Sequence, residues 1–311
     1  MSLPRDSKVY IAGHQGMVGR ALWRAMETAG FTKLIGRTRA ELDLRDPAAT
    51  QTFLAAEQPA VIIIAAAKVG GIEANRTQPA DFFFDNQQIQ TNLIHGAHRL
   101  GARKLLFLGS SCMYPREAAQ PLTESALCSG PLEPTNEGYA TAKLAGWKMC
   151  QAYRQQYGHD FITAIPTNLF GLFDHYEPGR SHVIPALIAK YHQAKAEGTA
   201  SVTNWGSGAP QREFLNVDDA AAGCMFLLDH YSEAEPINIA GGTELSIREL
   251  NEQIAALTSY SGAVEWDTEK PDGMPRKLLD GSRLQAMGWA PKMSFADGLE
   301  QAYADYCERV A

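Results

Sequence analysis

A glycine-rich turn close to the N-terminus constrains the fold of this chain more than any other stretch. The apolar run Lys8–Ala12 predicts a β-strand, and a segment of helical character begins near residue 20. Gly13, Gly16 and Gly19 lie between them with the spacing G-x-x-G-x-x-G. In a strand–turn–helix unit, such glycines permit a tight turn, let a pyrophosphate approach the backbone and let the helix pack closely on the strand. The stretch therefore predicts a dinucleotide-binding site at the first strand–helix junction.

Apolar and helical segments alternate along the first half of the chain. We predict strands at 33–36, 60–65, 104–108 and 161–165, and helices at 20–29, 46–57, 80–100 and around 139–144. Because parallel strands are joined by right-handed helical crossovers, this order predicts an α/β fold with a Rossmann-type, doubly wound parallel sheet.

The alternation loosens after about residue 170. We expect helices from 182 onward, at 219–228 with Asp218 as its cap and at 246–257, and strands at 202–205, 213–217 and 237–240. Residues 1–170 should form the dinucleotide-binding domain, with returning strands from about 213–245. Residues 171–311 should mostly form a smaller, C-terminal α/β lobe that binds substrate.

Charge and cysteine content narrow the function. The 311 residues carry a formal net charge of −7 at pH 7, which argues against a nucleic-acid partner. No apolar run has the length of a signal peptide or a membrane span, so we expect a soluble, cytoplasmic protein with no membrane partner. The five cysteines show no C-x-x-C pair and no metal-like spacing with histidine. We expect free thiols and no metal site.

Two arginines follow the second predicted strand. NAD-preferring proteins of this architecture commonly place an acidic residue there, against the ribose hydroxyls, but this chain has Arg37 and Arg39. Two guanidiniums suit a 2′-phosphate, so we expect NADPH/NADP as the cofactor. The alternative is that both are solvated loop charges.

A tyrosine and a lysine lie four residues apart in a segment free of proline and glycine. On a helix, Tyr139 and Lys143 share one face, and a nearby cation would lower the pKa of the phenol. Tyr139 is thus a candidate proton donor, although a half-buried tyrosine with a solvated lysine has the same spacing. Nearby in the predicted fold, strand 104–108 ends in Gly109, Ser110, Ser111 and Cys112, at the sheet edge where ligands bind.

The glycine turn, the serine at a strand end and the Tyr-x-x-x-Lys helix, in that order, resemble the extended short-chain dehydrogenase/reductases over nearly the whole chain. Within them, six stretches resemble the GDP-L-fucose synthase family. They are residues 12–19, 65–71, 108–115, 132–136, 181–187 and 270–273.

The resemblance implies a reaction and roles for five residues. That family epimerises C3 and C5 of GDP-4-keto-6-deoxy-D-mannose and then reduces the C4 ketone with NADPH. Tyr139 and Ser110 would hydrogen-bond the C4 oxygen, and Lys143 would hold the nicotinamide ribose. Cys112 and His182 match the family's acid and base on the two faces of the sugar. Taken singly, they could equally be a small buried side chain and a structural histidine.

The resemblance also implies binding residues and an assembly. The cofactor-binding positions are Gly13, His14, Gln15, Gly16, Met17, Val18, Gly19, Arg37, Arg39, Leu108, Gly109, Ser110, Tyr139, Lys143, Pro166, Thr167, Asn168, Leu169 and His182. The substrate-binding positions are Ser110, Cys112, Asn168, Lys190, Trp205, Arg212, Asp272 and Arg276. Two helices of the sheet face would pair into a homodimer. Gln15, Gly138 and Lys190 depart from the family, which often has arginine, proline and arginine there.

Two other functions fit the same pattern. One is another nucleotide-sugar enzyme of the branch, such as a 4-epimerase or a dehydratase with tightly held NAD, against which Arg37 and Arg39 argue. The other is a non-catalytic NADP(H)-sensing protein, which would be expected to lack the tyrosine or the lysine.

Overall fold

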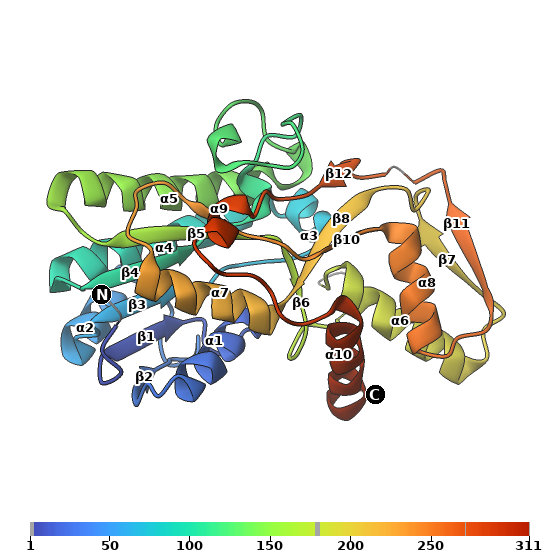
Figure 1. Ribbon diagram of the computed structural model, residues 1–311, viewed down its shortest axis with the longest axis horizontal. Helices are drawn as coiled ribbons and strands as arrows, with labels where there is room; N and C mark the ends of the chain where they lie inside the picture. The colour runs from blue at the N-terminus through green and yellow to red at the C-terminus, as the bar shows by residue number, and fades with distance from the viewer. Residues whose placement is uncertain (1–2, 178–180, 271, 311) are drawn as a thin grey trace.

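A six-stranded parallel sheet forms the centre of the larger part of the molecule (Figure 1). The computed structural model describes residues 3–177, 181–270 and 272–310. The strand order is β2-β1-β3-β4-β5-β9, with β1 Lys8–Ala12, β2 Lys33–Ile35, β3 Val61–Ile64, β4 Lys104–Leu108, β5 Phe161–Pro166 and β9 Ile237–Ile239. The chain leaves β1 toward β2 and returns to β3 on the other side of β1. This reversal confirms the doubly wound sheet and places its switch point, where sheets of this kind bind ligands, at the carboxyl ends of β1 and β3.

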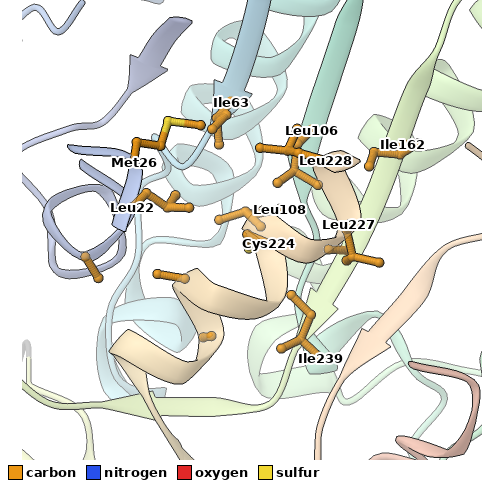
Figure 2. Close-up of a cluster of buried hydrophobic side chains, with 14 of the residues drawn as sticks. Leu22, Met26, Ile63, Leu106, Leu108, Ile162, Cys224, Leu227, Leu228 and Ile239 are labelled. Carbon is orange, nitrogen blue, oxygen red and sulfur yellow. The ribbon is translucent and has the colours of Figure 1, made fainter. Parts of the chain in front are cut away.

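Helices cover both faces of this sheet. The side chains of each strand point alternately into two apolar cores, one on each face, and the helices enclose these cores. Val9 and Ile11 of β1 enter the core beneath α1 (Met17–Thr28) and α7 (Val217–His230), whereas Tyr10 and Ala12 enter the opposite one. Figure 2 shows the first core, where Leu22 and Met26 of α1 meet Cys224, Leu227 and Leu228 of α7 over the sheet. The opposite face carries α2 (Pro47–Glu57), α4 (Pro79–Leu100) and α5 (Glu137–Tyr157), with the short α3 (Ile72–Thr77) before α4.

A second, smaller lobe lies beyond the carboxyl edge of the sheet (Figure 1). Strand β8 (Gln211–Asn216) pairs with β10 (Thr243–Ser246), β12 (Arg276–Lys277) and β6 (Asn168–Phe170), and β7 (Ser201–Trp205) pairs with β11 (Ala263–Asp267). Helices α6 (Val183–Glu197), α8 (Ile247–Leu257) and α10 (Phe295–Arg309) share its apolar core, and α9 (Ser282–Ala286) returns to β9. The described helices include none long and apolar enough to cross a membrane.

Two expectations about the C-terminal half are corrected. Of the strands between 213 and 245, only β9 joins the main sheet, because β8 and β10 pair with each other and Phe214 packs into the second core. Helix α7 begins at Val217, and its cap is Asn216, whose side chain accepts a hydrogen bond from the backbone N–H of Asp218. Both residues suit a cap, but Asn216 ends the strand with the extended backbone that a cap requires.

Candidate active site

The glycine turn has the geometry of a dinucleotide cradle. Gly13 adopts a φ of 85°, and a Cβ there would lie 2.6 Å from the backbone nitrogen of Ala66. A Cβ on Gly19 would lie 2.1 Å from the carbonyl oxygen of Gly13, so only glycine allows α1 to approach the turn this closely. Met17 and Val18 open the helix and pack against the core. The turn therefore leaves the first backbone N–H groups of α1 facing the switch point of the sheet.

Three predicted catalytic side chains meet where β4 ends. Ser110 caps a short 3-10 helix (Ser111–Met113), and its hydroxyl accepts a hydrogen bond of 3.2 Å from the backbone N–H of Cys112. The same hydroxyl is hydrogen-bonded to the phenol of Tyr139, which lies in the first turn of α5. The sheet edge and the helix thus join one hydroxyl, one phenol and one thiol in a single cluster.

Lys143 lies one turn beyond Tyr139 on the same helix face, but it does not lower the pKa of the phenol as expected. Its ammonium donates a 2.8 Å hydrogen bond to the carbonyl of Leu108 and lies 5.9 Å from the centre of the Tyr139 ring. Burial dominates both residues: it raises the pKa of Tyr139, helped by the nearby Cys112 and partly offset by Ser110, and lowers the pKa of Lys143 to about 8. The phenol is therefore protonated at neutral pH, as a proton donor must be.

The sulfur of Cys112 is contacted from two directions. The side-chain amide of Asn136, directly before α5, donates to Sγ at 3.2 Å, and the ammonium of Lys277 in β12 donates at 3.5 Å. Neither donor is among the predicted site residues. Asn136 ends one of the family-like stretches and Lys277 lies in a basic run, so the sequence contained a signal for both.

The predicted adenosine side holds one paired and one open arginine. Arg37 pairs with Glu57 at 2.8 Å and lies 5.2 Å over the ring of Phe53, whereas Arg39 is exposed. His14 packs beneath Gly36, and its buried Nδ1 has no hydrogen-bond partner among the described residues. Burial lowers the pKa of this histidine. Gln15 is exposed, and its carbonyl accepts from Arg20 at 2.9 Å.

The segment after β5 is held by the second lobe. Gly109 at the end of β4 donates its backbone N–H to Ala164 of β5 at 2.8 Å. Pro166 ends β5, Thr167 is buried, and the side-chain amide of Asn168 donates to the carbonyl of Glu213 at 2.8 Å. Leu169 packs against the core of the main sheet.

Glu213 is the fully buried centre of this junction. Its carboxylate accepts backbone N–H groups from Gly241 at 2.8 Å, Gly242 at 3.0 Å and Leu279 at 3.1 Å. Two chain segments, residues 241–242 and the one that contains Leu279, are thereby fixed to one carboxylate.

Arg212 of β8 brings a cation from the second lobe toward Cys112. It is half-buried, and its electrostatic neighbours are Asp272 and Cys112, while burial lowers its pKa. Asp272 accepts the backbone N–H of Ser207 at 2.9 Å and the Ser207 hydroxyl at 2.6 Å, and these bonds lower its pKa. Trp205 precedes this turn and is 73% exposed. The three predicted substrate residues therefore lie in one neighbourhood, and Arg212 extends it to Cys112.

Two other predicted substrate cations have partners in the second lobe. Arg276 forms a bidentate ion pair with Glu244, at 2.6 and 2.8 Å. The ammonium of Lys190 donates to the carbonyl of Thr203 and, at 2.8 Å, to the side chain of Asn204. Either would have to exchange or share these partners to bind a diphosphate.

His182 immediately precedes α6, next to residues 178–180, which lie outside the described part of the chain. Its side chain is exposed and makes no hydrogen bond to another described residue. The surrounding protein and the neighbouring His175 lower its pKa. The geometry thus joins Ser110, Cys112 and Tyr139 directly, whereas no described contact joins His182 to them.

Phe173, which lies between β6 and α6, contacts both the first and the last helix. The ring of Phe173 lies 4.7 Å from the guanidinium of Arg20 in α1 and 5.1 Å from that of Arg309 in α10. Its backbone N–H donates to Asp305 at 3.1 Å. Phe173 is therefore fixed against the first and the last helix.

A dinucleotide fits these residues better than a metal would. The glycine cradle, the partnerless His14 nitrogen and the exposed Arg39 provide a turn for the pyrophosphate and donors for a 2′-phosphate. Across the described ranges, no cluster of three or more histidine, cysteine or acidic side chains has the arrangement of a metal site.

Comparison with known proteins adds a family to this geometry. Residues 9–240 match the family described as NAD dependent epimerase/dehydratase. The chain is similar to "Putative GDP-L-fucose synthase 2" of Arabidopsis thaliana, with 54% identity over 99% of this chain and 94% of that protein. It is similar to "GDP-L-fucose synthase" of Escherichia coli K12, with 48% identity over 97% of each chain. A crystal structure of a GDP-L-fucose synthetase from Naegleria fowleri bound to NADP superposes with a TM-score of 0.90 at 26% identity, covering 99% of this chain and 96% of that one.

Proposed function

The chain belongs to the NAD dependent epimerase/dehydratase family and, within it, to the GDP-L-fucose synthases, and from this premise we propose how its residues perform that family's reaction. The protein is an NADP-dependent oxidoreductase and epimerase that converts GDP-4-keto-6-deoxy-D-mannose to GDP-L-fucose. The observation that carries the residue assignment is the cluster at the end of β4, where Ser110 contacts both Tyr139 and the backbone of Cys112.

Epimerisation needs a stabilised enolate and proton transfer at two sugar carbons. Hydrogens next to the C4 ketone become acidic when the oxygen receives hydrogen bonds, and the hydroxyls of Tyr139 and Ser110 are the donors that we assign to it. Cys112, on the same turn, exchanges a proton with the ring on one face. His182 is the residue that we assign to the other face.

Reduction of the ketone requires a proton for the C4 oxygen. When bound, NADPH supplies the hydride. Tyr139 gives its phenolic proton to the same oxygen, which the raised pKa of the neutral phenol supports. We assign Lys143, whose ammonium donates to the Leu108 carbonyl at 2.8 Å, to the hydroxyls of the nicotinamide ribose.

Cofactor and nucleotide recognition divide between the two lobes. We assign residues 1–170 mainly to NADP(H), with the turn from Gly13 to Gly19 on the pyrophosphate and Arg37 and Arg39 on the 2′-phosphate. Residues 171–311 mostly bind the GDP-sugar. There Arg212 meets the diphosphate and Trp205 offers a surface for stacking.

We further propose a cytoplasmic homodimer. All five cysteines are free, which suits a reducing compartment. Helices α4 and α5 lie side by side on one face of the sheet (Figure 1) and expose Phe84 and Tyr157, by 57% and 50%. Light scattering should give twice the mass of one chain, and a monomer mass would contradict the pairing.

The function is tested by incubating the protein with GDP-4-keto-6-deoxy-D-mannose and NADPH in deuterated water. NMR should show GDP-L-fucose carrying deuterium at C3 and C5. A product reduced at C4 without inversion would instead indicate a simple 4-reductase. The variant Cys112→Ala should still bind NADPH but should incorporate no deuterium, and full exchange at both carbons would remove Cys112 from the mechanism.

A further inference from the structure

A cation that the sequence motifs do not assign lies against the sulfur of Cys112. Strand β12 contains only Arg276 and Lys277, which pair in parallel with Gln211 and Arg212 of β8. Because side chains alternate along a strand, Arg276 and Lys277 point to opposite faces of this sheet. Lys277 shares the face of Arg212, which is the face toward the candidate active site. Of the two residues of β12, Lys277 is the one that contacts Cys112.

The two cations also differ in their partners. Arg276 is neutralised by Glu244 through two hydrogen bonds. Among the described residues, no carboxylate forms an ion pair with Lys277. The electrostatic interaction of Arg212 with Asp272 is stronger than its interaction with Cys112. The carboxylate of Asp272 therefore already balances part of the charge of Arg212. Among the described residues, the polar contact of the Lys277 ammonium is therefore the sulfur of Cys112 itself.

Both donors to Cys112 come from segments far away in the sequence. Asn136 approaches from the main lobe at 3.2 Å and Lys277 from the second lobe at 3.5 Å. A sulfur that accepts one neutral and one charged donor is better stabilised as an anion than one without them. A proton-exchanging thiol needs that stabilisation each time its proton is absent.

We propose that Lys277 is a positioning residue for Cys112: its ammonium donates a hydrogen bond to Sγ and stabilises the negative charge on the sulfur between proton transfers. The lysine keeps its own proton throughout and forms no bond to the substrate. The role of Cys112 in turnover rests on the proposed function, whereas the contact between Lys277 and the sulfur does not.

The test measures alkylation of Cys112 by iodoacetamide at neutral pH, without substrate, in the full chain. Only the anionic sulfur reacts, so Lys277→Met should slow modification of Cys112 by about 5-fold or more, while Lys277→Arg keeps most of the rate. Peptide mass spectrometry separates Cys112 from the exposed Cys128, which serves as the internal reference. Lys292→Met, which removes an exposed lysine, is the matched control.

The same variants are then assayed for deuterium incorporation at C3 and C5 of the keto sugar. We expect Lys277→Met to lose exchange in proportion to its slower alkylation, with NADPH affinity unchanged. Alkylation of Cys112 at the wild-type rate in Lys277→Met would overturn the proposal, as would Lys277→Arg being as slow as Lys277→Met. A wild-type protein that alkylates normally but does not turn over the sugar would instead contradict the proposed function.

Discussion

Lys277 lies directly opposite Arg212 in the register between β12 and β8, so two cations from neighbouring strands face the candidate active site. Lys277 contacts the sulfur of Cys112, and Arg212 interacts electrostatically with both Asp272 and Cys112. A sugar linked to a diphosphate carries its charge and its reacting carbons at different ends. Adjacent strand positions can therefore serve the two ends separately.

Replacing Tyr139 by phenylalanine should slow NADPH oxidation with the keto sugar by about 100-fold or more, because the C4 oxygen loses its proton donor. The rate is followed by loss of NADPH absorbance. Tyr157→Phe changes an exposed tyrosine at the end of the same helix and is the matched control. An unchanged rate in Tyr139→Phe would exclude the phenol as the donor.

Lys143 should make stability depend on alkaline pH. Its pKa is lowered from 10.5 to about 8 in the folded state, so between those values the unfolded chain binds more protons and the free energy of unfolding rises with pH. Below about pH 8 the buried ammonium costs about 3 kcal/mol relative to a neutral side chain.

The neutral variant Lys143→Met shows this cost by difference. Urea unfolding of wild type and variant, without cofactor, should give wild type a relative gain as the pH rises from about 8 to about 10. Packing and the lost bond to Leu108 affect the variant equally at each pH and cancel. A difference that stays constant with pH would show that the lysine titrates normally.

Neutralising Arg212 should weaken binding of the GDP-sugar more than neutralising Arg276. Arg212→Gln should raise the KM for the GDP-sugar by about 10-fold or more, because a charge-assisted bond to the diphosphate is lost. Arg276→Gln should have a smaller effect, since Glu244 already neutralises that guanidinium. Steady-state kinetics of the two variants decide the point, and the reverse order of effects would assign the diphosphate to Arg276.

Glu57 should weaken cofactor binding by holding Arg37. Arg37→Gln should reduce the preference for NADPH over NADH by about 10-fold, whereas Glu57→Gln should increase NADPH affinity a few-fold by freeing the guanidinium. Affinities are measured by fluorescence titration. Arg99→Gln, in the last turn of α4, is the control for a change of net charge. Equal affinity of wild type for both cofactors would remove the role of Arg37 and Arg39.

Glu213 should matter for stability more than for chemistry. Glu213→Gln replaces one acceptor oxygen by a donor amide beside three backbone N–H groups, so at least one buried N–H loses its partner. We expect a loss of about 2 kcal/mol or more in urea unfolding. Gln211→Glu, a partly exposed position two residues earlier in β8, is the comparison. Equal stability of wild type and Glu213→Gln would show that the junction does not depend on the carboxylate.

The main sheet could be predicted because its strands are buried on both faces and read as continuous apolar runs, such as Val61–Ile64. The second lobe was harder. Whether Phe214 packs into the main core or into a separate one depends on pairing with β6 and β10, which no local pattern encodes. The choice of Asn216 over Asp218 as a helix cap depends on where the preceding strand ends.

The candidate active site, too, could be predicted only in part. The strand-end position of Ser110 and Cys112 and the helical spacing of Tyr139 and Lys143 follow from periodicity, and the structure brings these residues together. The direction of the Lys143 ammonium toward Leu108 does not, because a flexible side chain takes the nearest buried acceptor. Sequence alone also could not distinguish Arg276 from Lys277, since the face of each depends on the register with β8.

Because of that register, the number of residues between β11 and β12 determines which side chain of β12 faces Cys112. Sliding β12 by a single position would turn the guanidinium toward the thiol and send the ammonium outward, with no side chain replaced. The number of residues between Asp267 and Arg276 is therefore under chemical constraint, because it sets which of the two cations reaches the thiol.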